Sequence, residues 1–263
     1  LREGEAIRDF IYPDRVIIGT DSKKANKILK TLYMPIVKKD SRYFITSRRG
    51  AELIKYASNS FLATKISFIN EIANLCEKTG VDIKDISLGI GSDQRIGYRF
   101  LRAGPAYGGS CFPKDTRALI DIGYKFKTNM SIVKSVVKSN NDRKILLIEK
   151  VRLILNHKLK NKRITFLGVT FKPNTDDMRE ASSIPMIKYL NKKNCEINYY
   201  DPSGEKVEFK NLKNVKYCNS ITLACLNTDL IILHTEWNDF KLLNFKKLVK
   251  KKKILKFLIW EIY

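Results

Sequence analysis

One short segment of this 263-residue chain combines the residue types that covalent catalysis requires. It reads Gly108-Gly109-Ser110-Cys111-Phe112-Pro113-Lys114-Asp115. The paired glycines let the backbone approach a ligand closely. Cys111 stands just ahead of a predicted helix start, where the helix dipole and Lys114 both favour the thiolate. Asp115, four residues on, is spaced to act as a base or to orient water, so the segment predicts an activated thiol beside a carboxylate.

Two further polar groups are candidates for the same site. Lys55 and Asn59 are four residues apart, which places them one turn apart on one face of a helix. They are either exposed, with the lysine stem lying on apolar surface, or turned into a cleft. Residues 171–179 read Phe-Lys-Pro-Asn-Thr-Asp-Asp-Met-Arg and follow a predicted strand. Open α/β sheets bind ligands at the carboxyl ends of strands, although a solvated loop has the same composition.

The few histidines and the spacing of the cysteines limit which residues can catalyse a reaction or bind a metal. The chain has only His157 and His234, so catalysis must use Cys, Lys, Asp, Glu or Tyr. The five cysteines form no C-x-x-C pair, and together with two histidines they predict no metal site. An odd number of cysteines without a disulfide framework indicates reduced thiols and a cytoplasmic protein.

The middle of the chain must position these residues on helices. Apolar residues recur at steps of three or four over 48–78, with Thr46 and Ser47 as candidate caps and Gly80 just past the end. A helix this long is typical of a spine between domains or of a subunit interface. Further helices are predicted over 83–88, 116–122 and 130–155, with a glycine-rich loop over 91–109.

The flanking parts predict parallel sheets. A strand over 15–19 and a helix over 22–32 are typical of the end of a βα domain. After His157, strands and helices alternate, which predicts a doubly wound, Rossmann-like parallel sheet. The predicted strands are 163–167, 196–200, 229–234 and 254–260, and the helices are 184–191 and 221–226. The expected fold class is therefore α/β, with domains over 1–47, 48–157 and 158–263.

Composition and charge exclude some classes of protein. With 44% hydrophobic residues the chain is not disordered, and its apolar runs are too short for a membrane helix. The net charge of +23 allows contact with a polyanion, and the densest run is Lys246-Lys247 with Lys250–Lys253. Lysines are otherwise scattered, and no recognition helix accompanies them. A solvated surface is the favoured interpretation, and specific nucleic-acid binding is not expected.

Five blocks in order carry a resemblance to a known family. They are 1–4 with 14–16, 51–59, 95–97 with 100–101, 108–115, and 171–180. Over nearly its whole length the sequence resembles the UDP-glucose 6-dehydrogenase branch of the UDP-glucose/GDP-mannose dehydrogenase family. Relatives that act on UDP-N-acetylmannosamine typically carry His where this chain has Ser110. The GDP-mannose branch remains the alternative.

The resemblance implies an NAD-dependent, two-step oxidation of UDP-glucose to UDP-glucuronate. Asp115 and Lys55 would handle the proton, and Asn59 would help hold the oxyanion. Cys111 would form a thiohemiacetal and then a thioester that water hydrolyses. The resemblance assigns the nucleotide sugar to Glu3, Lys55, Asn59, Arg95, Phe100, Leu101, Arg102, Ala103, Gly104, Gly108 and Lys172, with Arg95 reaching the substrate of a neighbouring subunit. It assigns NAD to Glu3, Lys114 and Arg179.

The resemblance also implies a homodimer through the central helix and a dinucleotide-binding Rossmann domain ahead of Leu1. Residues 1–47 would be the last part of that domain, so this chain is expected to bind a nucleotide sugar without complete activity. The closing residues 258–263 depart from the family pattern, and we hypothesise that this tail is out of the ancestral reading frame. A non-catalytic nucleotide-sugar-binding or dimerisation module is the alternative function.

Overall fold

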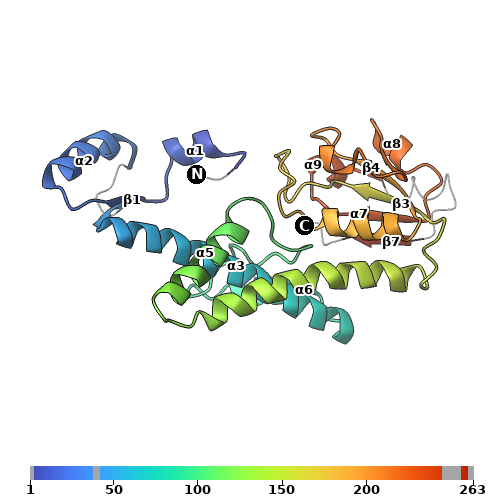
Figure 1. Ribbon diagram of the computed structural model, residues 1–263, viewed down its shortest axis with the longest axis horizontal. Helices are drawn as coiled ribbons and strands as arrows, with labels where there is room; N and C mark the ends of the chain where they lie inside the picture. Colours follow the sequence, from blue (N-terminus) through green and yellow to red (C-terminus); the bar gives the residue numbers. More distant parts are fainter. Residues whose placement is uncertain (1–2, 38–41, 245–255, 260–263) are drawn as a thin grey trace.

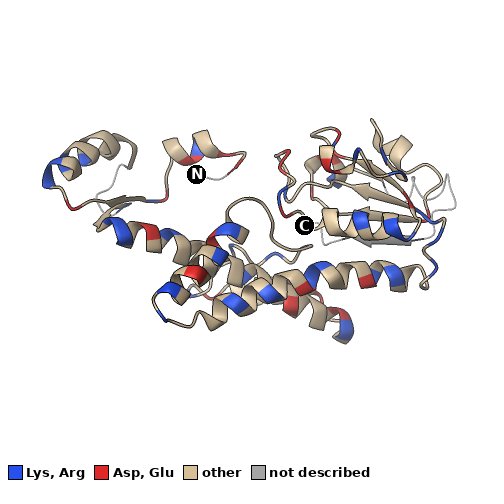
Figure 2. Ribbon diagram, in the orientation of Figure 1, with Lys and Arg blue, Asp and Glu red and all other residues tan. Residues whose placement is uncertain are grey.

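The computed structural model describes residues 3–37, 42–244 and 256–259. The basic run at 246–253 and the closing residues 260–263 lie outside the described residues. The molecule is elongated, with the N-terminal elements at one end, a parallel sheet at the other, and the helices α3 and α6 between them (Figure 1). Lys and Arg are found on every part of the ribbon, as Figure 2 shows.

The helical region consists of α3 (Arg48–Thr79), α4 (Ile83–Gly91), α5 (Phe112–Lys125) and α6 (Ser131–Ile154). The Ser47 hydroxyl accepts a hydrogen bond from the Gly50 amide and caps α3, and Gly80 ends it with φ +75°, as predicted. The predicted start of α5 was one turn late. The helix begins at Phe112 with Cys111 as its N-cap, because Pro113 is tolerated in a first helical turn.

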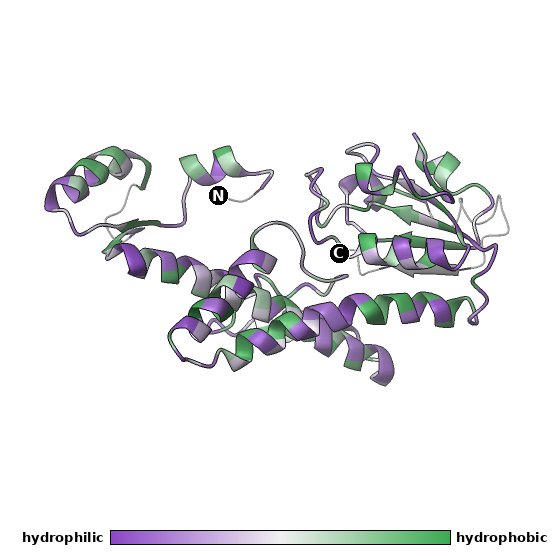
Figure 3. Cartoon of the chain, in the orientation of Figure 1, coloured by the Kyte–Doolittle hydropathy of each residue, from purple (hydrophilic) through white to green (hydrophobic). Residues whose placement is uncertain are grey.

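The C-terminal region is a five-stranded parallel sheet. Its strands are β3 (Arg163–Leu167), β4 (Glu196–Tyr200), β5 (Val215–Tyr217), β6 (Leu230–Leu233) and β7 (Lys256–Ile259), in the order β5-β4-β3-β6-β7. Its helices are α7 (Ser183–Lys192), α8 (Ile221–Ala224) and α9 (Asn238–Lys241), with a 3₁₀ turn over Val207–Phe209. Leu147 and Val151 of α6 are fully buried in the same core as strand residue Phe166, so α6 is part of this region too. The central strands β3 and β6 are almost entirely buried, as expected for the middle of a covered parallel sheet. Figure 3 shows hydrophobic residues along parts of this sheet and its helices.

The N-terminal region is smaller and less covered. It comprises α1 (Ala6–Ile11), β1 (Val16–Gly19), α2 (Lys23–Val37) and β2 (Tyr43–Thr46). The strands β1 and β2 form a two-stranded parallel sheet that runs into α3. Apolar side chains of both helices are exposed, with Ile7 at 80% and Leu32 at 62%.

The predicted mixed α/β fold, with a helical middle and a parallel C-terminal sheet, is confirmed. Four short elements were not predicted, namely α1, β2, β5 and α9. In the part of the chain that is described, no helix has both the length and the apolar character needed to cross a bilayer.

Candidate active site

The first polar cluster joins α3 to α5. Lys55 Nζ donates to Asp115 Oδ2 at 2.8 Å, and Asn59 Nδ2 donates to the same oxygen at 2.5 Å. The predicted pair on α3 therefore converges on one carboxylate oxygen of α5. The Asp115 side chain is fully buried, whereas that of Lys55 is 55% exposed, so the cluster links a buried carboxylate to the surface.

Asp115 is held in its ionised form. Burial raises its pKa, but hydrogen bonds from Lys55 and Asn59, together with the nearby Lys55 and Lys114 charges, outweigh burial. The net result is a pKa below the ordinary value of 3.8. Its second oxygen, Oδ1, is buried without a hydrogen-bond partner, and Lys114 Nζ lies 3.7 Å away. This oxygen is available to accept a proton or a hydrogen bond from a bound molecule.

Cys111 caps the helix that carries Asp115. The Asp115 amide donates to the Cys111 carbonyl at 2.8 Å, so the two residues are one helical turn apart. All five cysteines are unpaired, and Cys111 is exposed whereas the other four are buried. The Ser110 hydroxyl lies 3.7 Å from the Cys111 sulfur. The exposed thiol thus stands at a helix N-terminus next to a buried carboxylate, which is an arrangement suited to covalent catalysis.

Three buried polar residues hold the loop that precedes Cys111. The Asn70 side chain accepts a hydrogen bond from the Gly104 amide at 2.8 Å. Asn140 accepts from the Tyr107 amide at 2.9 Å and donates to the Tyr107 carbonyl at 3.0 Å. Arg143 reaches from α6 to donate to the Gly104 carbonyl at 3.0 and 3.2 Å. Hydrogen bonds from side chains of α3 and α6 therefore hold the loop over 101–109 in place.

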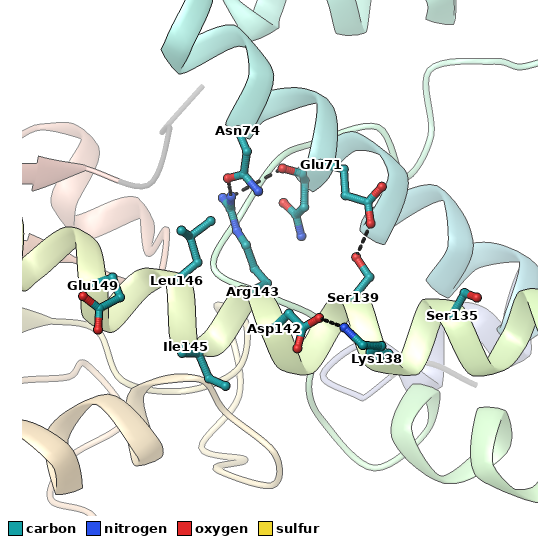
Figure 4. Close-up of a pocket in the computed structure, with 11 residues that line it drawn as sticks. Glu71, Asn74, Ser135, Lys138, Ser139, Asp142, Arg143, Ile145, Leu146 and Glu149 are labelled. Carbon is teal, nitrogen blue, oxygen red and sulfur yellow. Dashed lines mark hydrogen bonds and ion pairs between the residues drawn. The ribbon is translucent and has the colours of Figure 1, made fainter.

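Figure 4 shows Arg143 crossing from α6 to Asn74 of α3, within a groove between these helices. The sequence-based predictions do not include Asn70, Asn140 or Arg143, although for two of them the helical period gives a signal. Asn140 and Arg143 continue the buried stripe of α6 between Val136 and Leu147. A polar residue at a position that the helical period assigns to the core must bond to something buried.

The C-terminal region adds cations beside the Cys111 segment. Arg179 NH2 lies 3.2 Å from a carboxylate oxygen of Glu3, and Lys172 Nζ donates to the Glu3 carbonyl at 2.7 Å. The structure therefore brings together three residues that are far apart in sequence. Asp177, by its hydrogen bond and its charge, raises the pKa of Arg179, and Glu3 and Cys111 add smaller contributions in the same direction. Arg179 thus lies within electrostatic range of the thiol.

The two glycines before Cys111 are required by contact with that region. A Cβ on Gly108 would lie 2.8 Å from the Glu180 carbonyl oxygen, and one on Gly109 would lie 2.7 Å from the Phe171 ring. Gly109 also has φ +77° and donates from its amide to the Arg179 carbonyl at 2.7 Å. The Phe171 ring and the Arg179 backbone are therefore packed on the Cys111 segment, whereas Asn174, Asp176 and the Arg179 side chain are exposed, so the loop is only partly solvated.

The remaining predicted residues take different positions. Phe100 has φ +66°, and its ring meets Phe112 edge-on at 6.2 Å, which places it beside the Cys111 segment. The side chains of Leu101 and Ala103 are buried in an apolar cluster with Ile69, so only their backbone groups can meet a ligand. Arg102 and Lys114 are exposed. Arg95 is exposed and pairs with Asp93 at 2.6 Å, in the turn after α4.

Histidine takes no part in this arrangement. His234 is buried and bonds to Ser182 at 2.8 Å, and burial lowers its pKa to about 3. The site therefore offers a thiol, an ionised carboxylate, an amide and several cations. Together these can add a nucleophile to a carbonyl carbon, move a proton and stabilise an oxyanion near an anionic ligand.

Two family models match the chain. The model of the "UDP-glucose/GDP-mannose dehydrogenase family, central domain" matches residues 49–142, and the "UDP binding domain" model of the same family matches residues 165–258. The chain belongs to the UDP-glucose/GDP-mannose dehydrogenase family. The first match contains Lys55, Asn59, Cys111 and Asp115, and the second contains Lys172 and Arg179.

Individual members of the family are similar over most of the chain. It is 46% identical to the UDP-glucose 6-dehydrogenase of Rickettsia felis over 248 residues, and 43% identical to that of Rhizobium meliloti over 250 residues. These alignments cover 94% of this chain but only 55% and 57% of the relatives. The structure of a UDP-glucose dehydrogenase from Pyrobaculum islandicum matches 98% of this chain and 61% of that one, with a TM-score of 0.88 and 33% identity. The chain thus spans little more than half the length of these curated relatives.

Proposed function

We propose that this chain carries the nucleotide-sugar site and the thiol chemistry of an NAD-dependent UDP-glucose 6-dehydrogenase, which forms UDP-glucuronate. One observation carries the proposal. The buried Asp115, bonded by Lys55 and Asn59, lies one helical turn from the exposed thiol of Cys111. Relatives named UDP-glucose 6-dehydrogenase, at up to 47% identity among those compared, support UDP-glucose as the substrate.

The position of each residue supports a separate role in the reaction. Asp115, ionised and with no hydrogen bond to Oδ1, accepts the proton from the sugar hydroxyl, with Lys55 next to it. Asn59 donates to the oxyanion that develops on the same carbon. The Cys111 thiolate then adds to the aldehyde carbon to form a thiohemiacetal, whose oxidation gives a thioester. Water hydrolyses the thioester to the carboxylate and restores the thiol.

The residues near Cys111 also fit an anionic dinucleotide. Arg179 and Lys114 have side chains that are 61% and 69% exposed, and Arg179 lies within electrostatic range of the thiol. We assign these two cations and Glu3 to NAD, which when bound supplies the acceptor for the hydrides. Lys172, which contacts the Glu3 carbonyl, is assigned to the nucleotide sugar, together with the loop from Phe100 to Gly108.

The chain is proposed to act as a homodimer with three domains, at 1–47, 48–157 and 158–263. Phe61, Phe68 and Leu75 are 66%, 50% and 57% exposed and follow one another at seven-residue steps along α3. Such a stripe on a long helix suits packing against a second copy. Light scattering tests this, since Phe61→Glu/Phe68→Glu is expected to give a monomer. The five unpaired thiols support a reducing, cytoplasmic location.

Alkylation of Cys111 tests the substrate. Because the other four cysteines are buried, iodoacetamide is expected to label Cys111 first, as mass spectrometry of the peptides would show. UDP-glucose should slow this labelling, and GDP-mannose should slow it less. Equal labelling with and without UDP-glucose would contradict the proposal, and stronger protection by GDP-mannose would assign the chain to that branch.

Turnover separates an enzyme from a binding module. UDP-glucuronate and NADH are measured with UDP-glucose and NAD, before and after Cys111→Ser. Loss of UDP-glucuronate in the variant supports the thiol chemistry. Since the sequence contains no G-x-G-x-x-G motif, residues 1–263 alone are expected to show protection of Cys111 without NADH formation. Binding of UDP-glucose to Cys111→Ser, measured as binding heat, is expected in either case.

A further inference from the structure

Glu180 is the residue where the C-terminal region is tied to the helices that carry the site. It follows the polar loop after β3, and each of its carboxylate oxygens meets a cation from a different helix. Arg117 NH2 of α5 lies 2.5 Å from Oε1, and Lys144 Nζ of α6 lies 3.2 Å from Oε2. One side chain thus connects three elements.

Both partner helices hold parts of the candidate active site. Arg117 lies on α5, the helix that begins at Cys111 and carries Asp115. Lys144 lies on α6 next to Arg143, which bonds to the Gly104 carbonyl. The Lys144 side chain is only 13% exposed, so its contact with Glu180 is shielded from solvent more than a surface ion pair is.

The backbone of Glu180 adds a second, independent contact. Its carbonyl oxygen lies so close to Gly108 that a Cβ there would be at 2.8 Å, and the preceding carbonyl, of Arg179, accepts from the Gly109 amide. Glu180 itself has φ +56°, a left-handed conformation that costs free energy for any residue but glycine. Its ion pairs offset that cost and hold the loop in this conformation.

We propose that Glu180 is a positioning residue, whose carboxylate holds the Arg179 backbone beside the Cys111 segment. The inference rests on the proposed function for what Arg179 contacts, but not for the contact between the two segments. Loss of the Glu180 charge should not separate the two regions, because Leu147 and Val151 of α6, and Leu155 just after it, lie inside the core of the sheet region. The local fit of the loop is what should change.

Hydrogen exchange of the Gly109 amide reports this fit without any turnover. Glu180→Gln keeps the shape of the side chain and removes its charge. We expect exchange in the peptide containing Gly109 to rise by about tenfold, because its acceptor on Arg179 moves. Glu196→Gln is the matched control, since Glu196 pairs with Arg163 at 2.6 Å at the amino ends of β4 and β3, away from the loop that follows β3. Unchanged exchange in Glu180→Gln would overturn the proposal.

The partner residues extend the test from the other side. Arg117→Gln/Lys144→Gln should raise the same exchange, and adding Glu180→Gln to it should change nothing more, since the three side chains act as one unit. Should Glu180→Gln fold poorly, as circular dichroism would show, this pair of variants carries the test. If the effects of Glu180→Gln and of Arg117→Gln/Lys144→Gln on exchange added in full, the three side chains would not act as one unit.

A functional measurement distinguishes the failure of this inference from that of the proposed function. In Glu180→Gln, UDP-glucose should protect Cys111 from iodoacetamide less well, and kcat/KM for UDP-glucose should fall about ten- to a hundredfold wherever turnover is measurable. Altered exchange with no protection of Cys111 in any variant would contradict the proposed function alone. If UDP-glucose protected Cys111 fully in both the original protein and Glu180→Gln, and exchange was unchanged, only the role of Glu180 would be contradicted.

Discussion

Two acidic residues, Asp115 in the Cys111 segment and Glu180 whose backbone carbonyl packs on it, have carboxylates that are held in different ways. The Asp115 side chain is fully buried, and its donors Lys55 and Asn59 both come from α3, within the helical region. The Glu180 side chain is 39% exposed, and its partners lie on helices outside its own loop. Packing within the helical region thus positions the reactive groups. Contacts between different regions position Lys172 and Arg179, which are proposed to bind anionic ligands.

Asp115→Asn is expected to have the largest effect on turnover. The amide keeps the shape of the carboxylate but cannot take up a proton, so wherever turnover is measurable the rate of UDP-glucuronate formation should fall by about 10²- to 10⁴-fold. Chromatography of the nucleotide sugars measures this. The loss should exceed that of Glu180→Gln. A rate within about threefold of the original would mean that Asp115 contributes no more to turnover than a surface carboxylate does.

Loss of one donor to Asp115 should lower stability more than loss of one donor to Glu180. Asn59→Ala leaves Asp115 with fewer partners in a buried place, which should lower the free energy of unfolding by about 1–3 kcal/mol. Arg117→Gln removes an exposed ion pair, for which about 0–1 kcal/mol is expected. Urea unfolding compares the two. Equal losses would show that burial does not separate the two carboxylates.

Gly109 tests the contact between the regions. Gly109→Ala forces a side chain into a left-handed conformation, at about 1–2 kcal/mol, and into the Phe171 ring. Gly97→Ala is the matched control, because Gly97 has φ +68° with nothing within 4 Å of a new Cβ. Thermal unfolding should show the larger loss for Gly109→Ala. Phe171→Ala should relieve the excess, and an excess that remains would contradict the steric explanation.

The smallest expected effect is a difference in salt dependence at acid pH. Both folded-state pKa values are lowered, from ordinary values of 3.8 for Asp115 and 4.5 for Glu180. Each carboxylate therefore contributes stability that is complete above its ordinary value and is lost as the pH falls through the lower, folded-state value. At about 1 M salt the Glu180 contribution should be screened and that of Asp115 retained.

Unfolding midpoints of Asp115→Asn and Glu180→Gln, measured between neutral and acid pH at low and high salt, would show this. Each variant should lack part of the acid-induced loss seen in the original protein. A contribution from Asp115 that salt removes would mean that solvent reaches this carboxylate in the folded protein.

The elements with long apolar periods were predictable, and the short ones were not. α3 was predicted with both of its caps, because a regular stripe and a positive-φ glycine are local properties. The strands β2 and β5, with four and three residues, were missed. Such short strands exist because a neighbouring strand pairs with them, and pairing depends on parts of the chain that are distant in sequence.

For the site, local spacing predicted the one-turn separation of Lys55 and Asn59, and the placement of Cys111 beside a helix start. The family resemblance added roles for Lys172 and Arg179. Neither predicted the buried supports at Asn140 and Arg143, which interrupt an otherwise apolar stripe. Periodicity shows which face of a helix is buried, but it does not show which backbone groups that face will meet.

The amino-acid sequence by itself determined the long helices α3 and α6, the parallel character of the C-terminal sheet and the thiol at the start of α5, because these follow from local periodicity, glycine and proline. Only the tertiary structure decided that Lys55 and Asn59 converge on Asp115 Oδ2, and that Glu180 joins Arg117 to Lys144. The physical reason is that a hydrogen bond or ion pair requires atoms within about 3 Å. For residues more than thirty positions apart, only the packing of whole elements sets that distance.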